Sequence, residues 1–134
     1  MKIDGACHCK AITYEAEVDP DQVEICHCTD CQILSATAFR VVVPVPARDF
    51  RLLTGTPKNY TKTAESGRKG WMRFCPECGT QIYATSADGE PKVYNVRVGT
   101  AHQRNQLPTK RQYWSRSVLP WIDDIGFLPR FEKE

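Results

Sequence analysis

The seven cysteines of this 134-residue chain fall into three short groups, and this grouping constrains the fold more than any other feature. The groups are Cys7-His8-Cys9, Cys26-His27-Cys28-Thr29-Asp30-Cys31 and Cys75-Pro76-Glu77-Cys78. An odd number of cysteines cannot be closed by internal disulfides alone, whereas groups of two, three and two match the spacing of zinc ligands. We therefore predict a chain that folds around metal ions.

The Cys75–Cys78 group is followed by Gly79 and has the form of a zinc knuckle, in which glycine lets the chain double back. A C-x-x-C sequence can also be a thioredoxin-like redox pair, but that motif needs a βαβ setting. A knuckle requires two more ligands. Pairing it with Cys7 and Cys9 uses every thiol, whereas pairing it with two cysteines of the middle group would leave one thiolate over. The first division is the more economical.

Cys26, Cys28 and Cys31 would then hold a second zinc ion with one open position, an arrangement typical of catalytic zinc. Three thiolates make the ion a weak Lewis acid for water but a good site for another sulfur, and a coordinating thiol is deprotonated. Alternation along an extended strand would turn His8 and His27 away from the neighbouring sulfurs. The alternative is a structural site that is closed by His27, Asp30 or water.

The rest of the sequence indicates one mainly β domain over residues 1–134. Apolar residues make up 41% of the chain, and no run is long enough to span a membrane. The first residues lack the apolar region of an export signal, so we expect a cytoplasmic protein in which cysteines bind metal. Alternating or β-branched runs predict strands at 11–18, 38–43, 58–63, 82–85 and 92–98. Asp88-Gly89 indicates a hairpin turn, and residues 29–35 a short helix.

Charge is unevenly distributed, although the net charge of +2 is too small to indicate a nucleic-acid-binding protein by itself. No acidic residue lies between Glu90 and Asp123. Basic residues are interleaved there with aromatic ones: Lys92, Tyr94, Arg97, Arg104, Lys110, Arg111, Tyr113, Trp114, Arg116 and Trp121. This stretch, 92–121, fits a solvated basic face, a pocket for a small anionic substrate, or a nucleic-acid surface.

The three cysteine groups in their sequence context resemble the glutathione-dependent formaldehyde-activating enzyme family, which also contains centromere protein V. The matching segments are Gly5-Ala6-Cys7-His8-Cys9, Cys26-His27-Cys28-Thr29-Asp30-Cys31-Gln32, and Arg73-Phe74-Cys75-Pro76-Glu77-Cys78-Gly79-Thr80. Val98-Gly99-Thr100 and the tail from Trp121 to Glu132 are also similar to later segments of that family. The resemblance extends over nearly the whole chain, and three ordered cysteine groups make it specific.

The resemblance implies a β-tent fold of stacked antiparallel sheets around two zinc ions. One ion would be held by Cys7, Cys9, Cys75 and Cys78, the other by Cys26, Cys28 and Cys31. It implies a carbon–sulfur lyase that adds glutathione or a related thiol to a small aldehyde such as formaldehyde, giving S-hydroxymethylglutathione. Because glutathione has two carboxylates, basic side chains are candidates to hold it, chosen by charge only: Arg97, Arg104, Lys110 and Arg111.

Two other functions stay open at this point. The first is a non-catalytic zinc-binding module that recognises nucleic acid or another anionic partner through residues 92–121, and it predicts an affinity that falls with salt. The second is a thiol redox protein, in which the cysteines cycle without metal. The sequence assigns no general acid or base, since alternation turns His27 away from the metal.

Overall fold

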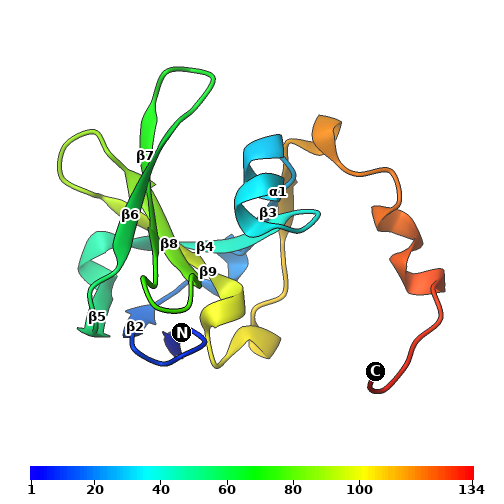
Figure 1. Cartoon of the computed structure of the whole chain (residues 1–134), viewed down its shortest axis with the longest axis horizontal. Helices are drawn as coiled ribbons and strands as arrows, with labels where there is room; N and C mark the ends of the chain where they lie inside the picture. The colour runs from blue at the N-terminus through cyan, green and yellow to red at the C-terminus, as the bar shows by residue number, and fades with distance from the viewer.

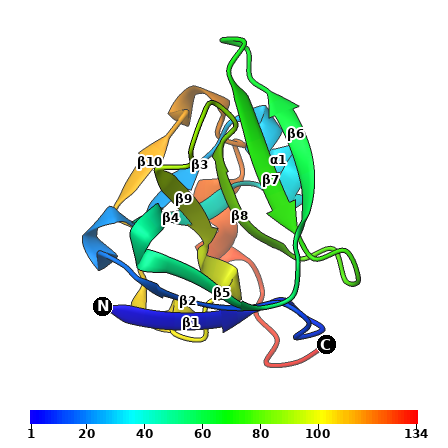
Figure 2. The ribbon, with the colours of Figure 1, turned by 90° about the vertical axis from the view of Figure 1, so that its left-hand side faces the viewer.

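The smaller of two β-sheets contains the N-terminus. The computed structural model describes all residues, 1–134. In the smaller sheet, β1 (Lys2–Ala6) pairs antiparallel with β2 (Thr13–Glu17), and β2 pairs antiparallel with β5 (Phe50–Thr54). Figure 2 shows these three strands stacked below the strands of the larger sheet. The smaller sheet therefore closes one side of the larger one.

The larger sheet has seven strands in the order β10-β3-β4-β9-β8-β7-β6. The strands are β3 (Glu24–Cys26), β4 (Arg40–Pro46), β6 (Lys58–Thr63), β7 (Lys69–Phe74), β8 (Gln81–Ser86), β9 (Val93–Arg97) and β10 (Arg111–Tyr113). All neighbours pair antiparallel except β10 and β3, which are parallel. The prediction of a mainly β fold of stacked antiparallel sheets is confirmed.

The predicted helix, the five predicted strand runs and the turn at Asp88-Gly89 are also confirmed. The short helix α1 covers Thr29–Ser35 (Figure 1), and each predicted strand run overlaps a strand of the structure. β8 and β9 pair antiparallel, and the connection between them contains Gly89 at φ +75°. The turn is wider than a two-residue hairpin, because residues 87–92 all lie outside the strands.

The hydrophobic core lies between the two sheets. An aromatic chain runs through it, in which Phe50 stacks at 5.4 Å from Tyr14 and contacts Tyr83 and Tyr94 at ring-centroid distances of 5.0 and 5.1 Å. Val43 is fully buried in this core. Its neighbour Val42 is also buried but lies outside this core, because side chains alternate along a strand. The larger sheet thus has a second buried face, and the middle cysteine group borders it.

Gly5 is needed where β1 crosses the segment after β9. A Cβ at this position would overlap the Tyr14 hydroxyl and the Thr100 carbonyl oxygen, and Tyr14 itself hydrogen-bonds to Thr100 Oγ1 at 2.9 Å. We expect Gly5→Ala to lower the free energy of unfolding by about 1–3 kcal/mol, since overpacking forces the backbone apart. Denaturant unfolding measures this. Gly126→Ala is the control, because nothing lies within 4 Å of its Cβ; equal losses in both variants would contradict the prediction.

The C-terminal segment after β10 runs along one side of the molecule, apart from the sheets (Figure 1). It forms two 3₁₀ helices, Ser115–Ser117 and Ile122–Phe127, and exposes large apolar side chains such as Phe127 and Phe131. None of the helices in the structure has the length and apolar character that crossing a bilayer requires.

Candidate metal centres

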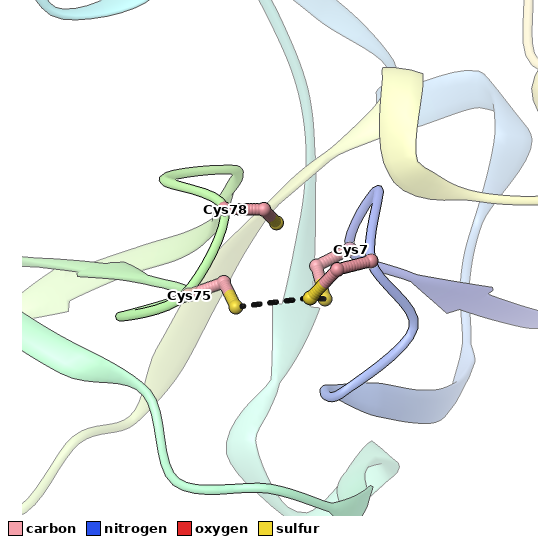
Figure 3. A group of neighbouring side chains, drawn as sticks. Cys7, Cys75 and Cys78 are labelled. Atoms are coloured by element: carbon pink, nitrogen blue, oxygen red, sulfur yellow. Dashed lines mark hydrogen bonds between the residues drawn. The ribbon is translucent and has the colours of Figure 1, made fainter.

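Four cysteine sulfurs from two distant turns meet at one point. The Sγ atoms of Cys7, Cys9, Cys75 and Cys78 all lie within 4.8 Å of one another. The Cys7–Cys9 and Cys9–Cys75 sulfur distances are 3.6 and 3.7 Å. A zinc tetrahedron with Zn–S bonds of about 2.3 Å has edges of about 3.8 Å, so the sulfurs have the spacing that zinc needs. Figure 3 shows Cys7, Cys75 and Cys78 pointing toward one another from the two turns.

The first pair of these sulfurs is positioned by a tight turn. We expected Cys7 and Cys9 on an extended strand, which is wrong, because β1 ends at Ala6. The Lys10 N–H donates to the Cys7 carbonyl at 3.0 Å, and Lys10 adopts φ +66°. The Ile12 N–H donates to Cys7 Sγ at 3.3 Å. The turn between β1 and β2 therefore brings the sulfurs together and supplies a backbone donor to one of them.

The second pair lies in the turn between β7 and β8. The Gly79 N–H donates to the Cys75 carbonyl at 2.9 Å, and Gly79 has φ +77°, as the knuckle motif requires. The turn closes with the Cys75 N–H donating to the Thr80 carbonyl at 2.9 Å. A hydrogen bond from the Thr80 hydroxyl lowers the pKa of Cys78 to about 5, so its sulfur is a thiolate at neutral pH.

The middle cysteine group forms a second cluster at the start of α1. Cys26 ends β3, Cys28 is the N-cap of α1, and Cys31 lies in its first turn. The three sulfurs lie within 4.8 Å of one another, and Cys28 Sγ accepts the Cys31 N–H at 3.3 Å. Cys31 is buried, whereas Cys26 and Cys28 are partly exposed. A ligand can therefore reach this cluster from the side of Cys26 and Cys28.

The electrostatics of this cluster favour a thiolate. Hydrogen bonding with the Cys31 thiol lowers the pKa of Cys26 to about 5, and the positive charge of Arg40 acts in the same direction. The hydrogen bond to Cys26, together with burial, raises the pKa of Cys31. Cys26 is thus ionised at neutral pH. A cluster that already shares one negative charge has the donor chemistry for a thiophilic divalent cation.

Neither histidine of the cysteine groups joins the sulfurs. His27 is buried, its Nε2 lies 2.7 Å from Gln112 Oε1, and its ring meets the ring of Phe39 edge to face. His8 is exposed. Asp30 forms an ion pair with Lys62 at 3.0 Å. Of the side chains that the sequence left open as a fourth ligand, neither His27 nor Asp30 is in the sulfur cluster.

A cavity of about 630 Å³ opens beside Cys28. Besides Thr29 and Asp30 of α1, its wall includes Lys62 of β6 and, from the C-terminal segment, Trp114 and Arg116. The Arg116 guanidinium lies 5.8 Å from the centre of the Trp114 ring, over its face. The cavity therefore combines two cations and an aromatic surface next to one cysteine of the three-cysteine cluster.

The structure does not bring the four basic candidates into one wall. Arg97 is buried near the middle group, Arg104 donates to the Ala101 carbonyl at 3.2 Å, and Lys110 lies 3.4 Å from Asp21 Oδ1. Arg111 donates to the Asp21 carbonyl at 2.8 Å. That these four residues contact glutathione stays a prediction. Within the basic stretch 92–121, Arg97 is therefore buried, whereas the other three side chains contact neighbouring carbonyl or carboxylate oxygens.

Sequence reasoning missed Arg40 and Lys62, and only Arg40 had a signal in the sequence. Arg40 is the one charged residue in an otherwise apolar run at 38–43, and β pairing places it opposite Cys26. Lys62 lies in the largely polar run 58–63, where nothing in the sequence distinguishes it from Lys58. Only the folded sheet brings β6 next to α1, where Lys62 meets Asp30.

Comparisons with known proteins agree with this architecture. A family model described as glutathione-dependent formaldehyde-activating enzyme matches residues 2–117. An uncharacterised lyase of Schizosaccharomyces pombe is 28% identical over 87 residues, which cover 65% of this chain and only 60% of that protein. A crystal structure of a Rhodobacter sphaeroides protein matches with a TM-score of 0.61 and 22% identity, over 81% of this chain and 98% of that one. The last likeness shows a shared fold.

Proposed function

This chain belongs to the glutathione-dependent formaldehyde-activating enzyme family, and from that premise we propose that it is a zinc-dependent carbon–sulfur lyase. The reaction would join glutathione or a related thiol to a small aldehyde such as formaldehyde, or cleave the adduct. The observation that supports this most is the three-cysteine cluster beside a cavity, with no fourth protein ligand among its sulfurs.

Each cysteine has a role in this proposal. Zinc at the three-cysteine cluster would supply an open position that binds a thiol sulfur and removes its proton. Cys26, Cys28 and Cys31 hold that ion, and the partly exposed side of Cys28 leaves access for the thiol. The four-cysteine cluster of Cys7, Cys9, Cys75 and Cys78 is a closed set of ligands and has a structural role, as four-cysteine zinc sites do.

The cavity beside Cys28 supports glutathione as the thiol. Glutathione is a flexible tripeptide with two carboxylates and one ammonium group, so it needs cationic and anionic contacts at some distance from its sulfur. Lys62 and Arg116 provide positive charges, and Asp30 and Glu65 provide negative ones, in the same wall. The face of Trp114 offers an apolar surface for the peptide stem.

Metal content and thiol binding test the proposal directly. We expect two zinc ions per chain and saturable binding of glutathione, measured by elemental analysis and isothermal titration calorimetry. S-methylglutathione is the matched control, because it keeps both carboxylates and the ammonium group but has no ionisable thiol. It should bind at least about 10-fold more weakly, since a thioether forms no thiolate ligand. One zinc per chain, or equal binding of both ligands, would contradict the proposal.

A further inference from the structure

A second cavity near the three-cysteine cluster is lined by two arginines and no acidic side chain. It lies between α1, β4 and the turn before β8 and has a volume of about 580 Å³. Its polar lining residues are Arg40, Arg97, Ser35, Thr37, Thr80 and Gln81. Pockets of this size hold small ligands, and one lined by two arginines and no acidic residue is suited to an anion.

The buried Arg97 and the partly buried Arg40 both lack an acidic partner. Arg97 is only 6% exposed, and neither Arg97 nor Arg40 forms an ion pair. Arg97 donates to the Asn95 carbonyl at 3.2 Å, and both arginines otherwise reach only the thioether sulfur of Met72, at 3.6 and 4.0 Å. The Nε atoms of both are buried without a hydrogen-bond partner. Because a thioether is a weak acceptor, most of the donor capacity of the pair is unused.

Pairing of the strands explains why the arginines lie together beside a cysteine. Cys26 of β3 is directly opposite Arg40 of β4, and Val42 of β4 is opposite Arg97 of β9. Directly paired residues and residues two apart on one strand share a face of the sheet. Cys26, Arg40 and Arg97 therefore project to the same side. The positive charge of Arg40 acts on both Cys26 and Cys31.

The thiolates alone do not balance these charges. A divalent ion on three thiolates has a net charge of −1, which offsets one of the two guanidinium groups. Burial, together with the like charge of Arg40, lowers the pKa of Arg97 to about 9, so Arg97 is still charged at neutral pH. Two neighbouring cations, one of them the buried Arg97, repel each other, and an anion between them would relieve that repulsion.

We propose that Arg40 and Arg97 bind a carboxylate group of the substrate beside the three-cysteine cluster. The planar guanidinium fork matches a carboxylate with two parallel hydrogen bonds, which the Met72 sulfur cannot offer. The inference rests on the proposed function, because the carboxylate belongs to one of the two substrates of that reaction. Either the thiol provides it, as glutathione would, or the aldehyde does, as a small 2-oxo acid would.

Acetate binding tests the anion site without any turnover. With the zinc-loaded protein at constant ionic strength, we expect calorimetric titration to show acetate binding to the wild type and to Arg48→Met, whose side chain is 84% exposed in the 3₁₀ helix between β4 and β5. In Arg97→Met the affinity should fall about 10- to 100-fold, because a charge-assisted bidentate contact is lost. Without acetate, Arg97→Met should melt at the same or a higher temperature, since an unpaired buried charge is removed.

Arg40→Met repeats the test if Arg97→Met fails to fold. Absence of acetate binding in the wild type, or equal binding in the wild type and both variants, would overturn the inference. Zinc content measured in each variant shows whether the cysteine cluster is intact.

Turnover then identifies the source of the carboxylate. If the thiol supplies it, Arg97→Met raises KM for glutathione but not for 2-mercaptoethanol, with formaldehyde as the common aldehyde. If the aldehyde supplies it, the variant raises KM for glyoxylate but not for formaldehyde, with 2-mercaptoethanol as the common thiol. Unchanged KM values in every pairing would overturn the inference and leave the proposed function standing. If acetate binds but no pair of thiol and aldehyde is turned over, the proposed function is contradicted and the anion site is still supported.

Discussion

Cys75→Ser is expected to abolish the cooperative unfolding of this protein. Cys75 is fully buried, belongs to the hydrophobic core, and lies 3.7 Å from the Cys9 sulfur. A structural zinc site contributes an apparent 10–16 kcal/mol in small zinc domains, roughly the whole net stability of 5–15 kcal/mol of a typical domain. Losing one ligand of the four should therefore remove a contribution as large as the net stability of the domain.

Circular dichroism through a thermal scan, together with zinc analysis, measures this effect. The near-ultraviolet signal of the aromatic core should disappear, and the zinc content should fall. Treatment of the wild type with a strong chelator should produce the same state. A variant that kept two zinc ions and a sharp thermal transition would show that these four cysteines do not form a structural site.

Cys31→Ser is expected to remove activity while leaving the fold in place. Cys31 lies in the first turn of α1 at the edge of the larger sheet, outside the core between the sheets. Serine keeps the size of the side chain but supplies no thiolate, so one zinc ion per chain should be lost. Substitution of a residue that only hydrogen-bonds to a metal ligand typically lowers activity about 10–100-fold. Loss of a ligand itself should therefore lower the turnover of glutathione with formaldehyde at least about 100-fold.

The two serine variants serve as controls for each other. Both remove one buried sulfur, but they belong to different clusters, so only Cys75→Ser should unfold the chain. The assay subtracts the uncatalysed addition of glutathione to formaldehyde. If Cys31→Ser kept full turnover with a folded structure, the three-cysteine cluster would not be the active site.

Several features of the fold follow from local sequence patterns. The strands at 58–63 and 92–98, the helix at 29–35 and the positive φ of Gly79 were predictable because each depends on side-chain alternation, capping or a turn that a few adjacent residues specify. The turn at Cys7–Cys9 was not predictable in this way. A C-x-C sequence is compatible with a strand, and only the left-handed conformation of Lys10 closes the turn.

The candidate sites, too, were predictable only in part from the sequence. Counting thiols was enough to group the cysteines into four and three, because sulfur is scarce and metal coordination needs fixed numbers of ligands. Which basic residues lie near the cysteine clusters was poorly predicted. Positive charge is common on any protein surface and does not indicate which residues will be close in the fold. Arg97 was selected by charge, whereas its partner Arg40 was missed, because their proximity depends on the pairing of β4 with β9.

The sequence by itself determined which cysteines form each cluster. Seven cysteines in groups of two, three and two predict two metal centres, since the chemistry of thiolates depends little on the rest of the chain. Only the tertiary structure decided what surrounds the second centre: a cavity at Cys28, and two unpaired arginines on the face of Cys26. Those neighbours come from strands far apart in sequence, and their electrostatic interactions depend on distances that only sheet register sets.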